Sequence, residues 1–267
     1  MEKSGELGFF HSDADLPELV QTILARTPAR LLRGRVGTGY RTDTLIELRD
    51  AHAAARDAVR TEIDMRRDLG STLVEELKLF EVCTQAKTKD DYLVRPDLGR
   101  HFSGEARQEI LRRCPLQTAL QLAIGDGLSV AAVREQVPKL MKLLWEGAKA
   151  RGWSIGQPFL VRHCRVGILN EIGDVLAPRV AILLIGERPG LATADSLSAY
   201  MAYQPGRNHT DADRNLISNI HARGLTTQHA AGRILELSAQ MVVRQKSGFT
   251  LREQATVLCD GEREPEN

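Results

Sequence analysis

The chain has 267 residues, of which 42% are apolar and 27% are charged, and its formal net charge is +1. A chain of this length buries roughly three quarters of the surface that its unfolded form exposes, so its core needs no disulfides or metal ions to hold it together. The longest apolar run, residues 180–185, is far too short to cross a bilayer, and the small net charge creates no global field that attracts nucleic acid. These totals exclude a transmembrane protein and do not favour a nucleic-acid-binding one.

The first residues and the cysteines bear on the cellular compartment. Phe9 and Phe10 form a lone apolar pair among acids, so residues 1–16 lack the apolar block of a secretory signal. The cysteines are widely spaced and include no C-x-x-C pair that would hold zinc or exchange disulfides; they are Cys83, Cys114, Cys164 and Cys259. We therefore expect a cytoplasmic protein with buried or idle thiols.

Residues 16–79 have the apolar spacing of helices. Leu16 and Val20 begin a first helical pattern, which a cluster of three glycines then ends. Thr44 and Glu47, three residues apart, form a capping-box pattern that predicts the start of a second helix. The N-terminal part is therefore expected to be a small helical unit.

A polar and irregular segment, residues 84–104, follows this unit. Such composition suits a connector between two domains. We therefore divide the chain into an N-terminal helical region with its connector, residues 1–100, and an α/β domain, residues 101–267.

From residue 117 onward, short apolar runs alternate with amphipathic helices, as in βαβ units around a parallel sheet. The predicted strands are residues 118–124, 158–164 and 180–185. Residues 180–185 are apolar on both faces, as expected of a central strand that helices cover above and below. The predicted fold class is α/β, with a Rossmann-like, parallel-sheet C-terminal domain beside the smaller helical one.

Further elements complete the α/β domain. Ser129 can cap a helix after the first strand, and Pro138 should kink or split that helix. Residues 197–203 alternate as a strand does, residues 204–213 form a polar loop, and residues 226–247 form an amphipathic helix.

Three loops follow the three predicted strands: residues 125–129, 165–167 and 186–190. Ligands of open parallel sheets bind outside the carboxyl ends of the strands, where glycines let the backbone approach and helix N-termini present N–H groups. Any single loop could be only a tight turn, but three together favour a ligand-binding rim. Glu187, directly after a buried strand, is placed to accept hydrogen bonds from a ligand's amides or hydroxyls, unless it pairs with Arg188.

The chain contains no recognisable self-sufficient catalytic motif. It lacks the P-loop pattern and a nucleophile elbow. Asp126, Asp211 and Asp213 have no compact metal-ligand spacing. His163 and Cys164, adjacent on a predicted strand, point to opposite faces and so cannot chelate one ion together. We expect no catalytic residue and no metal site, and we expect His163 and Cys164 to be packing residues.

Several strings of residues resemble one family. The longer ones are GERPGL at 186–191, ISNIH at 217–221, RPDLGR at 95–100 and PFLVR at 158–162, and shorter ones lie at 34–37, 126–129, 196–198 and 212–214. Together, from Arg35 to His221, they resemble the small (light) subunit of adenosylcobalamin-dependent ethanolamine ammonia-lyase.

The resemblance implies a complex with a large, barrel-shaped subunit that binds ethanolamine, and adenosylcobalamin held between the two subunits. It implies that Val166, Glu187 and Leu216 touch the cofactor. Leu216 stands where a cysteine can occur in the family, so its contact would be through backbone or apolar packing. The implied reaction converts ethanolamine to acetaldehyde and ammonia; the cofactor supplies the radical chemistry, and the protein supplies binding and orientation.

Two further expectations follow from the resemblance. Some cobalamin proteins use an Asp-x-His-x-x-Gly motif to replace the cofactor's lower base, and His52 and His229 match it only in part and follow no strand. The cofactor is therefore expected to keep its own base. The N-terminal leader that accompanies encapsulation in a bacterial microcompartment in some members is short here, which disfavours encapsulation.

Two other functions remain open at this stage. One is a stand-alone regulatory module for a nucleotide-like ligand, in which Glu187 recognises a ribose. The other is a scaffold that docks a partner through five arginines between residues 26 and 41. That basic stretch favours a solvated or partner-facing surface over a nucleic-acid site, because Tyr40 is the only aromatic residue beside it that could stack on a base.

Overall fold

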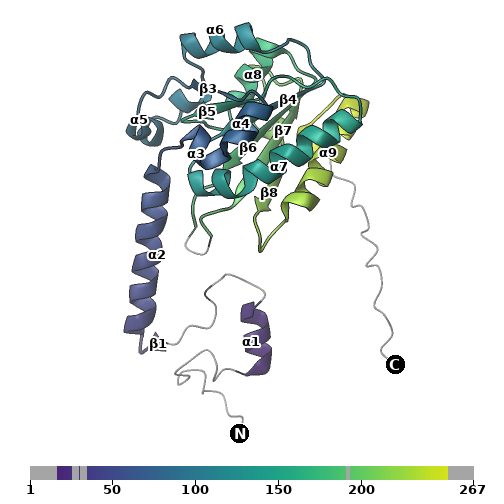
Figure 1. Ribbon diagram of the computed structural model, residues 1–267. Helices are drawn as coiled ribbons and strands as arrows, with labels where there is room; N and C mark the ends of the chain where they lie inside the picture. Colours follow the sequence, from purple (N-terminus) through teal and green to yellow (C-terminus); the bar gives the residue numbers. More distant parts are fainter. Residues whose placement is uncertain (1–16, 26–29, 31–34, 191–192, 252–267) are drawn as a thin grey trace, which may run out of the picture.

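The computed structural model describes residues 17–25, 30, 35–190 and 193–251. Its centre is a six-stranded sheet in the order β3-β5-β4-β6-β7-β8 (Figure 1). The first four strands in this order are parallel, and β7 and β8 join antiparallel at one side. The strands are β3 (Phe80–Cys83), β4 (Leu120–Gly125), β5 (Phe159–Arg162), β6 (Val180–Gly186), β7 (Leu197–Tyr203) and β8 (Asn215–Ile220). The α/β class is confirmed, although the sheet is mixed rather than parallel throughout.

Helices cover both faces of the sheet (Figure 1). Side chains of α3, α4, α7 and α9 form the core on one face, and those of α6 and α8 form the core on the other. The helices are α1 (Glu18–Ala25), α2 (Thr42–Arg60), α3 (Met65–Leu69), α4 (Ser71–Glu76), α5 (Lys89–Val94), α6 (Gly104–Arg113), α7 (Val130–Ala150), α8 (Ile168–Leu176) and α9 (Thr227–Arg244). Short elements are the hairpin β1 (Arg35–Val36) and β2 (Gly39–Tyr40), and the 3-10 turns η2 (Leu98–Arg100), η3 (Asp211–Asp213) and η4 (Gly248–Thr250). Among these described helices, none has the length and apolar character to cross a bilayer.

β6 is the central strand that its sequence predicts. All seven of its residues are buried. Ile182 and Leu184 face the core under α7 and α9, whereas Ala181 and Leu183 face the core under α8. Burying one such leucine or isoleucine contributes roughly 1.5–3 kcal/mol, so this strand anchors both layers.

α7 begins as predicted but is not split. The hydroxyl of Ser129 accepts a hydrogen bond from the backbone N–H of Ala132 at 3.1 Å and so caps the helix. The helix then continues through Pro138 to Ala150, so a split is wrong, whereas a kink at Pro138 stays a prediction. Val137, Leu140 and Met141 on either side of the proline are fully buried against the sheet. This packing outweighs the one hydrogen bond that proline removes.

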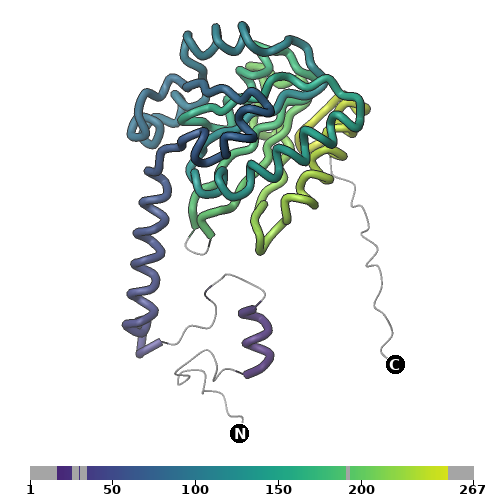
Figure 2. Tube along the Cα trace, viewed as in Figure 1, coloured from purple at the N-terminus to yellow at the C-terminus, as the bar shows by residue number. Residues whose placement is uncertain are grey.

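The N-terminal helices differ from the prediction in their details. α2 begins at Thr42, two residues before the expected capping residue, and its N-cap Arg41 makes no side-chain capping bond. Thr44 lies inside the helix, so the capping box is wrong. α2 extends away from the sheet (Figures 1 and 2).

The segment expected to be an irregular connector contains α5 and η2. Thr88 and Asp91 form a reciprocal capping box that starts α5. Immediately before it, β3 pairs with β5 over four residues, and Phe80 packs on Phe159 with ring centroids 5.5 Å apart. The division into two domains at residue 100 stays a prediction; the sheet itself draws strands from both sides of that residue.

Candidate functional site

The loops after β4, β5 and β6 lie together at the carboxyl ends of the parallel strands. The carboxylate of Asp126 accepts hydrogen bonds from the backbone N–H groups of His163 at 3.0 Å and Cys164 at 2.9 Å, which ties the first loop to the second. The N–H of Leu128 donates to the carbonyl of Gly186 at 3.1 Å, which ties the first loop to the third. The predicted rim is therefore one continuous surface.

A cavity of about 350 Å³ opens on this rim, and we call it the rim cavity. Both Val166 and Glu187 line it, together with Tyr92, Arg165 and Tyr200. Two of the three candidate residues thus come together, although 21 positions separate them in the sequence.

Glu187 is oriented by neutral donors. Its carboxylate accepts hydrogen bonds from the hydroxyl of Ser196, at 3.0 Å, and from the hydroxyl of Ser198. Its own N–H donates to the carbonyl of Ser196 at 3.1 Å. The alternative pairing with Arg188 does not occur between these two described residues. An ionised carboxylate has about four acceptor positions, so further donors can still bind to Glu187 from the cavity.

Leu216 lies on β8 directly opposite Tyr200 on β7. It is 47% exposed and lines neither of the cavities described here. Tyr200, in contrast, reaches the rim cavity beside Glu187; burial, followed by the charge of Glu187, raises the pKa of its hydroxyl. Leu216 therefore offers an apolar surface next to the cavity rather than inside it.

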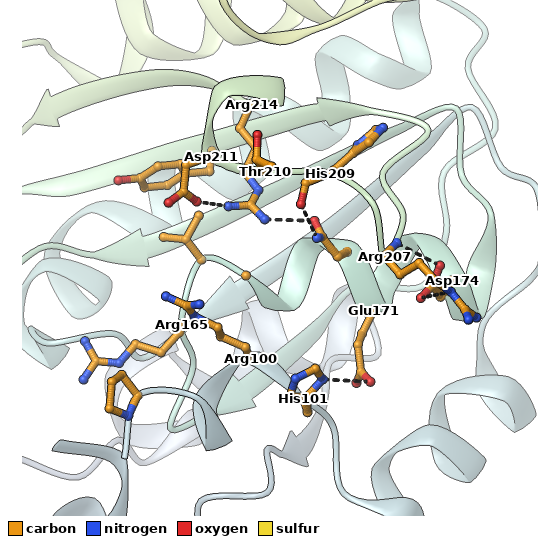
Figure 3. Close-up of a pocket in the computed structure, with 15 residues that line it drawn as sticks. Arg100, His101, Arg165, Glu171, Asp174, Arg207, His209, Thr210, Asp211 and Arg214 are labelled. Atoms are coloured by element: carbon orange, nitrogen blue, oxygen red, sulfur yellow. Dashed lines mark hydrogen bonds and ion pairs between the residues drawn. The ribbon is translucent and has the colours of Figure 1, made fainter. Parts of the chain in front are cut away.

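A second, larger cavity of about 700 Å³ adjoins the first (Figure 3). It lies between η2, α8 and the segment 207–214, and it shares Arg165, Val166 and Tyr200 with the rim cavity. We call it the arginine cavity because Arg100, Arg165, Arg207 and Arg214 line it. Sequence reasoning missed this cavity, although the motif at 95–100, the loop at 165–167 and the polar loop at 204–213 all supply residues of its wall.

Comparison with known proteins identifies the family. A family model described as "Ethanolamine ammonia-lyase light chain" matches residues 17–252. The chain is 38% identical over 235 residues to a protein of Clostridium acetobutylicum, covering 88% of this chain and 95% of that relative. It is 41% identical over 228 residues to a protein of Clostridioides difficile, covering 85% and 76%. Both relatives are named "Ethanolamine ammonia-lyase small subunit". The chain belongs to the ethanolamine ammonia-lyase light-chain family.

Membership of the ethanolamine ammonia-lyase light-chain family makes the chain a subunit of a lyase, as the resemblance predicted. It also favours that function over the regulatory module and the scaffold. The name of the relatives, small subunit, implies a larger partner in those proteins. The family motif at 95–100 supplies residues of the arginine cavity, and the motif at 186–191 supplies residues of the rim cavity.

One cluster in this light-chain protein has the composition of a metal site. Glu62, Asp126 and His163 have ligand atoms within 4.8 Å of one another. Protein donors already serve Asp126, however, because Lys89 Nζ lies 3.5 Å from its carboxylate in addition to the two backbone N–H groups. The ring Nδ1 of His163 lies 2.9 Å from the carbonyl of Ala86. The cluster is therefore explained as a buried ion pair that fastens the loops.

The environment of His163 and Cys164 differs in part from the prediction. β5 ends at Arg162, and His163 follows with a left-handed φ of 55°, so the two residues are not on a strand. Both are buried, as expected of packing residues. His52 on α2 and His229 in the first turn of α9 are exposed on helices, as expected. The expectation that neither follows a strand is wrong, because β2 precedes α2 and β8 precedes α9 in the chain.

Proposed function

We propose that the chain binds adenosylcobalamin at the rim cavity, as the small subunit of an ethanolamine ammonia-lyase that converts ethanolamine to acetaldehyde and ammonia. The observation that carries the proposal is that Val166 and Glu187 line one cavity. Leu216 lies on β8 opposite Tyr200, which lines the same cavity from β7. The same three residues are those that the family resemblance assigns to the cofactor.

The residues present suit a corrin ring. Such a ring is apolar on its faces and carries amide groups at its edge. The carboxylate of Glu187 can accept an amide N–H, while its two serine donors hold it in place. Val166 in the cavity wall and the exposed Leu216, which pairs with Tyr200, can supply apolar contact.

The cofactor, when bound, supplies the radical chemistry, and the role of this chain is binding and orientation. Among the described residues, no basic side chain forms an ion pair with Glu187. Its charge is therefore available to the ligand. We assign the residues that handle ethanolamine to a large, barrel-shaped partner subunit, which would cover the other side of the cofactor.

Reconstitution tests this proposal. The chain, a large subunit of ethanolamine ammonia-lyase and adenosylcobalamin are mixed, and ethanolamine-dependent release of ammonia is measured. We expect release only when all three are present. Equal activity without this chain would reject the proposal.

A further inference from the structure

Glu62 fastens the base of α2 to the loop after β5. α2 extends away from the sheet, and residues 61–64, which we call the junction, connect its last turn to α3 (Figure 1). Ile63 in the junction is buried in the core, whereas the side chain of Glu62 is 47% exposed. One carboxylate oxygen of Glu62 lies 3.4 Å from a terminal nitrogen of Arg162, and the other lies 3.3 Å from Nε2 of His163. The two contacts therefore join the helix to the end of a central strand.

The hydrogen bonds of His163 determine which ring nitrogen carries a proton. Nδ1 lies 2.9 Å from the carbonyl of Ala86, and a carbonyl can only accept, so Nδ1 is protonated. The neutral ring then has a lone pair on Nε2, and this lone pair faces the carboxylate of Glu62 at 3.3 Å. Two acceptors cannot form a hydrogen bond. A proton on Nε2 turns the same contact into an ion pair, so the contact depends on protonation.

The surroundings of His163 hold its ring in this place. The backbone N–H donates to the carboxylate of Asp126 at 3.0 Å, and the carbonyl accepts from the hydroxyl of Thr84 at 3.0 Å. The ring is stacked near that of Tyr92, with centroids 6.0 Å apart, and the side chain is only 8% exposed. A change in the charge of the ring therefore acts on Glu62 and is not relieved by solvent.

The nearest other charges are paired with one another. Lys89 Nζ lies 3.5 Å from the carboxylate of Asp126. Arg162 is shared between two carboxylates, with Glu81 at 2.5 Å the closer partner and Glu62 at 3.4 Å the more distant one. Glu62 thus has only a share of one cation, and a protonated imidazole gives it a second.

The remaining ionisable neighbours do not respond near neutral pH. Burial raises the pKa of the Tyr92 hydroxyl and of the Cys83 and Cys164 thiols, so these groups keep their protons there. Imidazole, in contrast, ordinarily changes its charge between pH 5 and 8. Three further charged side chains belong to the neighbouring segments: the exposed Lys87, Asp90, which pairs with Arg60 at 2.7 Å, and Arg165, which lies over the Tyr92 ring.

We propose that Glu62 and His163 form a pH-sensitive latch, which holds the base of α2 more tightly to the sheet when the imidazole is protonated. The protonated ring gains Glu62 as a partner only while the junction is closed, so the closed state is favoured below the range in which imidazole titrates. This advantage is lost as the pH rises through that range. The contact between Glu62 and Arg162 remains at higher pH, so the latch adjusts the junction and does not release it.

Hydrogen exchange of the full chain at pH 5.5 and pH 7.5 tests the latch. After correction for the chemical effect of pH on exchange, we expect the backbone amides of residues 58–66 to open roughly threefold less often at pH 5.5, as suits a half-exposed ion pair. Glu62→Gln should abolish this difference. Glu76→Gln removes an exposed carboxylate at the end of α4 and is the matched control, which should keep the difference.

His163→Asn should abolish the difference as well. Asparagine cannot ionise, yet its amide can still donate to the carbonyl of Ala86. It also tolerates the left-handed φ of 55° at this position, so the loop can keep its conformation.

NMR titration of the ring gives a second, independent readout. The signal of His163, identified by its loss in His163→Asn, should titrate at lower pH in Glu62→Gln than in the wild type or in Glu76→Gln, because the negative charge beside it is gone. Equal or faster opening of the wild-type junction at pH 5.5 would overturn the latch, as would a pH difference that survives in Glu62→Gln or in His163→Asn. A titration midpoint of His163 that Glu62→Gln leaves unchanged would overturn it too.

Discussion

The hydroxyl of Ser198 on β7 donates a hydrogen bond to the carboxylate of Glu187, which directly follows β6. β6 and β7 are antiparallel neighbours, with Ile185 opposite Ser198, so the end of one strand and the start of the other are held side by side. The serine thus fixes the rotamer of a carboxylate that borders the rim cavity. A pre-oriented acceptor loses less conformational entropy when a ligand binds.

Glu187→Ala should weaken cobalamin binding to the assembled complex by about 1–2 kcal/mol, or roughly fivefold to thirtyfold, because the acceptor for an amide N–H is lost. Equilibrium binding followed by corrin absorbance measures the change. Adenosylcobinamide, which has the corrin ring but lacks the nucleotide tail, should lose affinity to the same extent, because the proposed contact is with an amide of the ring. Unchanged affinity for both would reject the role proposed for Glu187.

Ser198→Ala should weaken the same binding by a smaller amount, about 1 kcal/mol or less, since Glu187 keeps its contact with Ser196. In the Glu187→Ala background the serine substitution should have no further effect on binding, because its partner is gone. Ser218→Ala on the exposed edge strand β8 is the matched control. Additive effects of the two substitutions would show that Ser198 does not act through Glu187.

Asp126→Asn should lower the free energy of unfolding by about 3–5 kcal/mol. The carboxylate is fully buried, accepts two backbone N–H groups and lies 3.5 Å from Lys89 Nζ, so the substitution leaves a buried ammonium unpaired. Urea denaturation measures the loss. Asp97→Asn, which breaks the exposed pair with Arg95, should cause little change. If the two substitutions lowered the free energy of unfolding by similar amounts, burial of Asp126 would not explain its contribution to stability.

Gly127→Ala and Gly152→Ala separate backbone strain from steric overlap. Both glycines have left-handed φ angles, 60° and 69°, so alanine costs about 1–2 kcal/mol at either position. A Cβ at Gly152 meets no atom within 4 Å, whereas one at Gly127 overlaps the carbonyl of Gly186. Gly127→Ala should therefore destabilise the fold clearly more than Gly152→Ala in thermal unfolding. Equal destabilisation would mean that the rim loops can move apart without cost.

The stability of the protein should decline at alkaline pH partly because of Cys114. Burial raises the pKa of this thiol to about 12, whereas a thiol in an unfolded chain titrates near 8.5. Below both values the thiol is protonated in both states, and its contribution to stability is complete. As the pH rises from about 8.5 toward 12, only the unfolded state loses the proton, so the folded state becomes relatively less stable.

Urea denaturation at pH 7 and pH 9.5 tests this dependence. Cys114→Ala should show a smaller difference in unfolding free energy between the two pH values than the wild type does. Ser218→Ala, at an exposed position on β8 without a titrating side chain, is the control. An identical pH dependence in wild type and Cys114→Ala would exclude the buried thiol as the cause.

The sequence by itself determined the central strands and the rim. Residues 180–185 are apolar at every position, so both faces of this strand must be covered by helices to be buried. β6 is such a strand. Since the carboxyl ends of parallel strands meet at one edge of a sheet, the sequence alone places the three loops and Glu187 together. The family motifs then indicated the lyase subunit.

Only the tertiary structure decided the remaining strands and the second cavity. β3 has only four residues, and the exposed residues of β8 do not alternate along the strand, so neither has a strong local pattern. Pairing with β5 and β7 defines these two strands. Pro138 stays inside α7 because its neighbours are buried. The arginine cavity depends on η2, α8 and the segment 207–214, which are distant in sequence. Whether an arginine is paired or free depends on which carboxylates fold beside it, and no local pattern of residues contains that information.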